Sequence, residues 1–255
     1  MDHWQDVYRH TGAVWGDTPS EIARRAVTDL TSRGLHRAGL RVLDVGCGYG
    51  RDLAYLRDRL DAVFVGVDAS PAALDLARDR LAGDPRVELY LARLQDIDLG
   101  RFDVLLAANV YHLLRPPERD LFRRLVLGHL RPGGLLYLST ASVRDPQHYG
   151  AGRAVPGEVH SFIDRGYLHF STGDELADEL GGLLRMDVLE EIEYREPRTD
   201  GGDHHHVSWI VIGRTPAAVD GAAHGAGDTP AKGLRRSPRD RRSNSSCTDG
   251  ERWDG

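Results

Sequence analysis

The chain has 255 residues, a formal net charge of −6 and a pI near 6.0. This length is enough for one well-buried domain, and the mild acidity gives no reason to expect a nucleic-acid partner. The two cysteines, Cys47 and Cys247, indicate neither a disulfide framework nor a cysteine metal site. The N-terminus lacks the pattern of a signal peptide, and no apolar run is long enough to span a membrane. We therefore expect a soluble, cytoplasmic protein without a membrane partner.

The first segment, residues 1–36, is predicted to form an arm followed by a helix. Residues 18–21 have the pattern of a helix start, and Gly34 is a plausible stop. The preceding arm is polar and contains three aromatic side chains, Trp4, Tyr8 and Trp15. These side chains could anchor the arm by hydrophobic contact, or they could form a lid over a cofactor and a substrate. Periodicity does not separate the two alternatives.

A glycine-rich turn follows the first predicted strand. The apolar run 42–45 is long enough for one buried strand, and glycines come next at alternate positions, Gly46, Gly48 and Gly50. A helical spacing of leucines follows them. Strand, glycine turn and helix allow a backbone to approach a ligand closely. The nicotinamide fingerprint shares this geometry, but it requires glycine or alanine where this chain has Arg51, so the spacing disfavours it.

The second predicted strand, residues 62–68, ends in an acid, Asp68. The tip of this strand is where an adenosine ribose would offer its two hydroxyls, and the two oxygens of a carboxylate suit two adjacent donors. The alternative role for Asp68 is to cap the next helix. Because Ser70 is available as that cap, we favour ribose binding.

Strand and helix patterns alternate along the rest of the domain. Such alternation predicts a doubly wound α/β fold with a parallel sheet and helices on both faces. The last two strands have no helix between them, which predicts a seven-stranded, mostly parallel sheet with an antiparallel last strand. The later strands are expected at residues 87–91, 102–109, 135–139, 186–194 and 207–212, and helices at 118–130 and from residue 172 to about 181.

Two other segments have no regular pattern. Residues 140–170 are predicted to be an irregular loop, and a loop of that length inside a domain is usually functional. From Thr215 the apolar periodicity is lost, so residues 215–255 are predicted to be a disordered tail. The intervening residues 37–214 would form the main domain.

The order Asp-Val-Gly-Cys-Gly-Tyr-Gly at residues 44–50 resembles the class I S-adenosylmethionine-dependent methyltransferases. The string Leu-Arg-Pro-Gly-Gly-Leu-Leu at 130–136 closely resembles the family pattern before its fifth strand. The resemblance extends over about residues 3–214 and implies a Rossmann-like methyltransferase fold with S-adenosyl-L-methionine as cofactor. A narrower similarity, to the tellurite-resistance and thiopurine methyltransferase branch, lies in residues 47–52, residues 66–70, the N-terminal aromatics and residues 169–171. Members of that branch methylate small, soft nucleophiles.

The resemblance also implies roles for individual residues. The glycine backbone would approach the methionine and ribose parts of the cofactor, and Asn109 would meet the methionine part through its backbone. Asp44 would support the loop and contact the cofactor ammonium, with capping of the loop amides as the alternative. The acid that usually accepts from the adenine amino group is replaced by Arg93, which leaves Gln95, Asp96 or nearby backbone for that contact. The predicted cofactor-binding residues are Asp44, Gly46, Cys47, Gly48, Gly50, Asp68, Ala69, Gln95, Asp96 and Asn109.

Methyl transfer is an in-line displacement with a neutral leaving group, so it needs no acid. Much of its acceleration can come from alignment, and a base is needed only for a protonated acceptor of high pKa. The predicted base candidates are His112, His160, His204 and His206, and the predicted substrate or lid residues are Trp4, Tyr8, Trp15, Tyr111 and Tyr149.

The three consecutive histidines carry the most weight among these candidates. In an extended chain His204 and His206 share a face, and His205 points away. The turn before them should lie at the active-site edge of the sheet. Two histidines are an incomplete metal site without a further ligand, so no metal is predicted.

The leading interpretation is a small-molecule methyltransferase that acts as a monomer or homodimer. A second interpretation is methylation of RNA or protein, although the chain lacks an Asn-Pro-Pro-Tyr motif at Asn109, which argues against methylation of nucleic-acid bases. A third is a non-catalytic cofactor-binding or regulatory protein.

Overall fold

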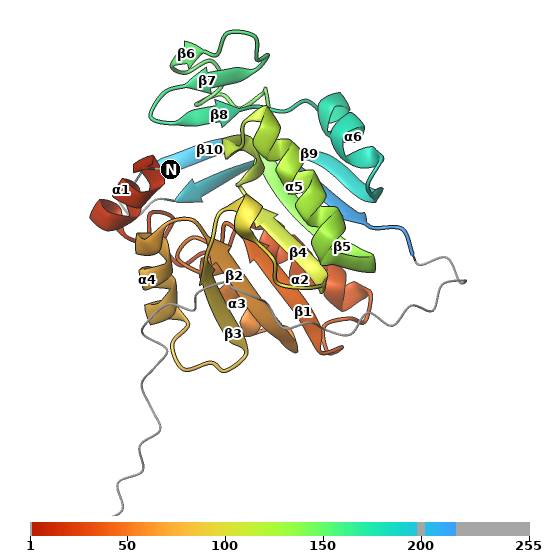
Figure 1. Ribbon diagram of the computed structural model, residues 1–255. Coiled ribbons are helices and arrows are strands. Elements are labelled where there is room, and N and C mark those ends of the chain that lie inside the picture. Colours follow the sequence, from red (N-terminus) through yellow and green to blue (C-terminus); the bar gives the residue numbers. More distant parts are fainter. Residues whose placement is uncertain (1, 198–201, 218–255) are drawn as a thin grey trace, which may run out of the picture.

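A seven-stranded sheet forms the centre of the described part of the protein, which comprises residues 2–197 and 202–217 of a computed structural model (Figure 1). The order across the sheet is β3-β2-β1-β4-β5-β10-β9. Strands β1 to β5 run parallel, and β10 is antiparallel to both of its neighbours, which confirms the predicted sheet. The strands are β1 (Leu40–Val45), β2 (Ala62–Asp68), β3 (Val87–Leu91), β4 (Phe102–Ala108), β5 (Leu130–Ala141), β9 (Arg185–Pro197) and β10 (Asp203–Arg214).

Helices cover both faces of the sheet, and each layer has its own apolar core. One core joins α2, α3 and α4 to the sheet, and the other joins α5 and α6 to the opposite face. Alternation along β1 places Val42 in the first core and Leu43 in the second, because successive side chains of a strand point to opposite faces. The helices are α2 (Glu21–Ser32), α3 (Arg51–Arg57), α4 (Pro71–Arg80), α5 (Pro116–His129) and α6 (Gly173–Gly181).

Three of these helices begin at the side-chain caps that the sequence indicates. Ser20, Ser70 and Thr172 each accept a hydrogen bond from the backbone amide three residues later. Such a cap satisfies an amide that would otherwise lack a partner at the helix start. Because Ser70 caps α4, the carboxylate of Asp68 is left for other contacts.

The predicted N-terminal arm contains a helix that periodicity did not reveal, α1 (Asp2–Thr11). It packs beside α4, where Gln5 Oε1 accepts from Ser70 Oγ at 2.6 Å and from Ala72 N at 3.1 Å. A ten-residue helix is marginal by itself, so this tertiary contact accounts for its presence.

The prediction of an irregular loop over residues 140–170 is wrong in part. This segment contains a small antiparallel sheet of β6 (Arg153–Ala154), β7 (Ser161–Ile163) and β8 (Tyr167–His169), which lies apart from the central sheet in Figure 1. Strands of two or three residues are too short to show the alternation that identifies a strand.

The chain remains attached to the sheet past its predicted end at residue 214. Thr215 is buried, its hydroxyl donates to Arg131 O at 2.6 Å, and its amide donates to Gly134 O at 3.0 Å. Gly133 N also donates to Pro216 O at 3.2 Å. The start of the predicted tail therefore belongs to the domain, and residues 218–255 lie outside the described residues.

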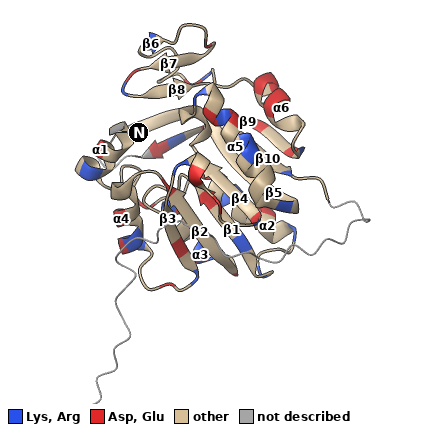
Figure 2. Cartoon of the chain, viewed as in Figure 1, with Lys and Arg blue, Asp and Glu red and all other residues tan. Residues whose placement is uncertain are grey.

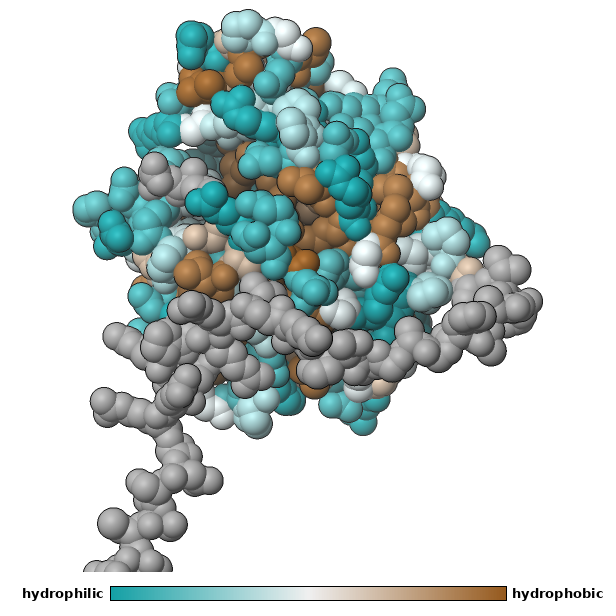
Figure 3. Space-filling view, in the orientation of Figure 1, coloured by the Kyte–Doolittle hydropathy of each residue, from teal (hydrophilic) through white to brown (hydrophobic). Residues whose placement is uncertain are grey.

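The surface of the described residues mixes charge and apolar character. Figure 2 shows basic and acidic residues interspersed along the helices on the visible face. Figure 3 shows apolar residues gathered around α5 and on the small sheet. Val159, in the connection between β6 and β7, is 75% exposed. Among the described residues, no helix combines the length and the apolar character needed to cross a membrane.

The contacts of Thr215 and Pro216 predict a sharp boundary for truncation. Removing residues 218–255 should leave the melting temperature unchanged. The sequence of this segment has no apolar periodicity, so we expect it to add no packing to the domain. Removing residues 215–255 should cost about 1–3 kcal/mol, because three hydrogen bonds to the sheet are lost. Chemical denaturation of both truncated chains tests this, and equal stabilities would show that Thr215 and Pro216 contribute nothing.

Candidate active site

The glycine turn lies at the carboxyl edge of the sheet, between β1 and α3. Gly46, Gly48 and Gly50 all have positive φ, at 72°, 54° and 75°. A Cβ on Gly46 would lie 2.4 Å from Val110 Cγ2, and one on Gly48 would lie 2.9 Å from Tyr8 Oη. Both the backbone conformation and the space therefore require glycine. The turn is packed between β4 on one side and the N-terminal arm on the other.

Asp68 joins the glycine turn to the start of α4. One of its carboxylate oxygens accepts from Gly48 N at 2.9 Å, and the other accepts from Ser70 N at 2.8 Å. Burial raises the pKa of Asp68, and these backbone hydrogen bonds oppose that rise. The carboxylate is thus held in place by the two segments that follow β1 and β2.

Asp44 is a buried acid beside this turn. Its side chain is 2% exposed, and Oδ2 accepts no hydrogen bond from the described residues. Burial and the nearby Asp52 and Asp68 raise its pKa well above the usual range. The amides of Gly46 and Cys47 donate to Val67 O, at 2.7 and 3.0 Å, so Asp44 does not cap them. An unpaired buried carboxylate oxygen is costly unless a cation or a donor reaches it.

The N-terminal arm covers the glycine turn with aromatic side chains. The Tyr8 ring lies 6.1 Å from that of Tyr49, and burial, together with the nearby Asp68, raises the Tyr8 pKa. The backbone amide of Trp15 donates to Tyr49 Oη at 3.2 Å, and this hydroxyl donates to Gly16 O at 3.0 Å. Tyr8 and Trp15 are thereby brought to the site. Trp4 lies closer to the start of α1 than Tyr8 does, and its ring is 6.0 Å from the Tyr8 ring.

A cluster of histidines lies on the other side of the arm. The Trp15 ring contacts His204 edge-on at 5.2 Å, and the His204 ring lies 5.5 Å from that of His206. Both histidines face the same side of β10, whereas His205 hydrogen-bonds Glu193 on β9 at 2.7 Å. The alternation expected for an extended chain thus holds here.

The small-sheet segment adds two members that sequence reasoning missed, Asp145 and His148. Asp145 is 2% exposed and accepts from His148 Nδ1 at 2.9 Å. The His148 ring stacks on His206 at 5.7 Å. The spacing of three residues could have indicated that Asp145 and His148 contact each other. Only the tertiary structure shows that their turn lies beside β10.

His112 approaches the same cluster from the 3-10 helix η2 (Tyr111–Leu113). Its Nδ1 is buried and makes no hydrogen bond with the described residues. Burial, and then the nearby His206 and His148, lower the pKa of His112 to about 3. The imidazole is therefore neutral at neutral pH, with a nitrogen lone pair available.

Asn109 connects the two sides of the site at the end of β4. It has a left-handed φ of 55°, and its Oδ1 accepts from Ser139 Oγ at 3.0 Å. The next residue, Val110, packs over Gly46, and His112 follows two positions later. A second connection is the buried ion pair between Arg51 and Glu196 at 2.5 Å, because Glu196 also lies 3.7 Å from His206 Nε2.

The side chains of several predicted residues lie outside both the glycine turn and the histidine cluster. The Cys47 side chain packs in the core beneath the turn, and Gln95, Asp96 and Ala69 are partly or fully solvent-facing at the same sheet edge. Tyr149 and His160 hydrogen-bond each other at 2.7 Å beside the small sheet. Within the described residues, no hydrogen bond, ion pair or ring contact joins His160 to another histidine, so its role as a base has no support from the geometry.

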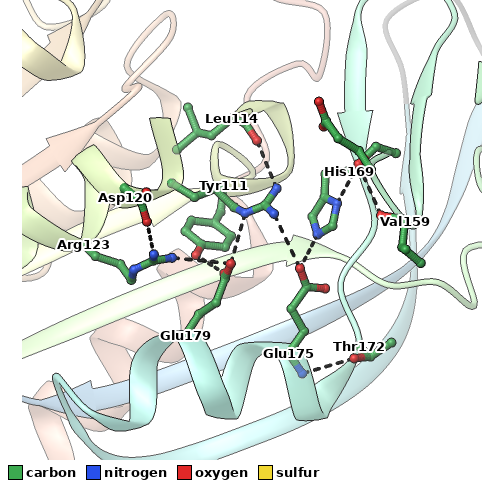
Figure 4. A network of polar contacts seen from close by, with 12 residues as sticks. Tyr111, Leu114, Asp120, Arg123, Val159, His169, Thr172, Glu175 and Glu179 are labelled. Carbon is green, nitrogen blue, oxygen red and sulfur yellow. Dashed lines mark hydrogen bonds and ion pairs between the residues drawn. The ribbon is translucent and has the colours of Figure 1, made fainter. Parts of the chain in front are cut away.

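Tyr111 is the clearest correction, because its side chain is fully buried in the core. Its hydroxyl donates to Glu179 of α6, as Figure 4 shows. Glu179 also accepts from Arg119 Nε at 3.3 Å. Arg119 lies 3.6 Å from Glu175, and Glu175 lies 2.9 Å from His169. This polar network attaches η2 to α5, α6 and the small sheet, so Tyr111 positions the segment that carries His112.

Comparison with known proteins supplies the family. A family profile described as a methyltransferase domain matches residues 42–134. The methyltransferase GfsG of Streptomyces halstedii is 30% identical over 68% of this chain. A ubiquinone biosynthesis O-methyltransferase of Xanthomonas oryzae pv. oryzae is 30% identical over 64% of this chain and 67% of its own length. The chain therefore belongs to the class I S-adenosylmethionine-dependent methyltransferases.

A solved structure agrees with this assignment at the level of the fold. The structure described as "Conversion of a Disulfide Bond into a Thioacetal Group during Echinomycin Biosynthesis" superposes with a TM-score of 0.63. It is 22% identical and covers 85% of this chain and 92% of that chain. The matches to curated relatives span 62% of the length of GfsG and as little as 35% of others.

The network of Figure 4 predicts a large stability effect at one position. Glu179→Ala should cost about 2–4 kcal/mol, because the buried Tyr111 hydroxyl and part of Arg119 lose their acceptor. Asp178→Ala, at the exposed neighbouring position of α6, is the matched control and should stay within about 0.5 kcal/mol of the parent chain. Urea denaturation measures both, and similar values for the two variants would contradict the assigned role.

Proposed function

We propose that this protein transfers the methyl group of S-adenosyl-L-methionine to a small-molecule acceptor. The observation that carries the proposal is the pairing of two half-sites at one sheet edge. The glycine turn with Asp44 and Asp68 forms one half, and the histidine cluster forms the other. Ligands of open α/β sheets bind at the carboxyl ends of the strands, where both halves lie.

The residues of the first half suit the cofactor. The buried Asp44 Oδ2 lacks a partner and would accept from the ammonium group of the methionine part. The carboxylate of Asp68 would accept from the ribose hydroxyls, and the absence of side chains at Gly46 and Gly48 would let the cofactor approach the backbone once the Tyr8 side chain moves aside. Gln95 and Asp96, which follow β3, remain the proposed adenine contacts. When bound, the cofactor supplies an electrophilic methyl group on a positively charged sulfur.

The residues of the second half would bind the acceptor. Trp15 and the imidazoles of His204, His206 and His112 offer flat rings together with nitrogen lone pairs. These groups could orient an acceptor, and His204 or His206 could take its proton, whereas the low pKa of His112 makes it a weak base. Alignment of acceptor and methyl would provide much of the acceleration. The arm that carries Tyr8 and Trp15 contacts both halves, which supports its role as a lid.

The relatives support a small acceptor, because the proteins similar to this chain include an enzyme of ubiquinone biosynthesis. The mixture of acidic and basic residues in Figure 2 favours a small molecule over RNA. Within the family, the proposed branch is that of the tellurite-resistance and thiopurine methyltransferases. It rests on residues 47–52 and 66–70 and on the N-terminal aromatics.

Labelled cofactor provides the direct test of methyl transfer. The protein is incubated with methyl-labelled S-adenosyl-L-methionine and a cell extract that is separated into low-mass and macromolecular fractions. Protein-dependent label should appear in the low-mass fraction. Label in RNA or protein would instead support a macromolecular acceptor, and cofactor binding without transfer to either fraction would support a regulatory protein.

The role of Asp68 predicts a loss of cofactor affinity. Asp68→Ala should weaken binding of S-adenosylhomocysteine roughly tenfold to a hundredfold, because charge-assisted hydrogen bonds are worth about 1.5–3 kcal/mol. Asp61→Ala, which lies just before the opposite end of β2, is the control and should bind normally. Calorimetric titration of folded variants checks this, and unchanged affinity in Asp68→Ala would remove this carboxylate from the site.

A further inference from the structure

Asp145, His148 and His206 place three potential metal ligands together on the acceptor side of the site. One ligand atom from each residue lies within 4.8 Å of the others. The ligands come from two segments far apart in sequence, the turn after β5 and the strand β10. From this geometry we propose that the three side chains bind a divalent transition-metal ion.

The distances within the cluster suit a shared ion. Asp145 Oδ1 lies 2.9 Å from His148 Nδ1, and Asp145 Oδ2 lies 3.7 Å from His206 Nδ1. Ligands bound at about 2.1 Å are roughly 3.0 Å apart in an octahedron and roughly 3.4 Å apart in a tetrahedron. These two separations are close to those values, and all three ligand atoms lie within 4.8 Å of one another, so side-chain rotation would have to bring the ligands closer together around the ion.

His206 presents a different ring nitrogen to each of two buried carboxylates. Its Nδ1, the nitrogen on the side of the cluster, lies 3.7 Å from Asp145 Oδ2, and its Nε2 lies 3.7 Å from Glu196 Oε2. A contact of that length between nitrogen and oxygen is too long for a hydrogen bond. His206 thus lies between two buried carboxylates, Asp145 and Glu196, without a hydrogen bond to either. Glu196 is paired with Arg51, so a cation held by His206 Nδ1 would compensate the charge of Asp145, and a neutral imidazole is a metal ligand.

The backbone holds the ligands in place. The side-chain oxygen of Gln147 accepts from His205 N at 3.0 Å, and Asp145 Oδ2 accepts from Val207 N at 3.3 Å. These two contacts fix the turn that carries His148 against the strand that carries His206. A metal site is more precise when its supporting contacts already define the positions of the ligands. The 32% exposure of the His148 side chain leaves a route from solvent.

The ligand set indicates the chemical class of the ion and its relation to the reaction. Two imidazoles and one carboxylate suit zinc, iron, cobalt or nickel in the divalent state better than calcium or magnesium. Three protein ligands also leave coordination positions open. If the proposed methyl transfer holds, those positions would face the acceptor, and an acceptor with an oxygen or sulfur donor would fit them.

Metal binding is tested without cofactor or acceptor. The full chain, purified without a histidine tag and stripped with a chelator, is titrated with Co²⁺ while its visible absorption is recorded. We expect one Co²⁺ per chain, displaced by Zn²⁺. His148→Ala and His206→Ala should each weaken Co²⁺ binding by at least about tenfold. His205→Ala is the matched control and should bind like the parent chain, because its side chain faces Glu193.

Two results would overturn the metal site. One is the absence of saturable Co²⁺ binding in the parent chain, and the other is equal weakening in His205→Ala and His148→Ala. His148 lies in a partly exposed turn, so its variant should fold even if His206→Ala does not, and circular dichroism checks both. Because the titration contains no methyl donor, failure of the metal site and failure of methyl transfer are separate outcomes.

Discussion

The carboxylate of Asp68 is the contact on which the cofactor half of the site depends. It accepts from the glycine turn after β1 and from the first turn of α4 after β2, so it fixes two loops relative to each other. Without this bridge the Gly48 amide would lose its acceptor, whereas the amides of Gly46 and Gly50 donate to Val67 O and Cys47 O. The same carboxylate is the one proposed to bind the ribose. If that proposal holds, one side chain at this edge carries both structural support and ligand binding.

The N-terminal arm extends this arrangement across the sheet. Gln5 is hydrogen-bonded at the start of α4, Tyr8 packs over Gly48, and Trp15 contacts the histidines of β10. Because α1 and the residues that follow it make these contacts along one short segment, the position of the arm is coupled to both half-sites. Local opening of such a segment needs less free energy than global unfolding, which is a property required of a lid. The aromatic residues of the arm can therefore serve as anchors and as a cover at the same time.

Adjacent residues of η2 show how the fold separates support from chemistry. Tyr111 points into the core and hydrogen-bonds Glu179, whereas His112 points toward the cluster of β10. The ion pairs of Arg119 with Glu175 and Glu179 are largely buried. Removing one partner would therefore leave a buried charge without full compensation. A network of this kind holds the buried His112 in a defined position. The depressed pKa of His112 follows from that burial.

The sequence by itself determined the features that depend on local spacing. The glycine turn, the acids at the ends of β1 and β2, the caps at Ser20 and Ser70, and the alternation of strands and helices all follow from residues near one another in the chain. Arg51 distinguishes the glycine turn from the nicotinamide fingerprint on sequence alone, but its ion pair with Glu196 could not be predicted. Only the tertiary structure decided which distant segments meet. The docking of α1, the burial of Tyr111 and the approach of Asp145 and His148 to His206 each depend on the path of a long connection. Periodicity carries no information about such paths, because the contacts are between residues far apart in the chain and the strands of the small sheet are too short to show a pattern.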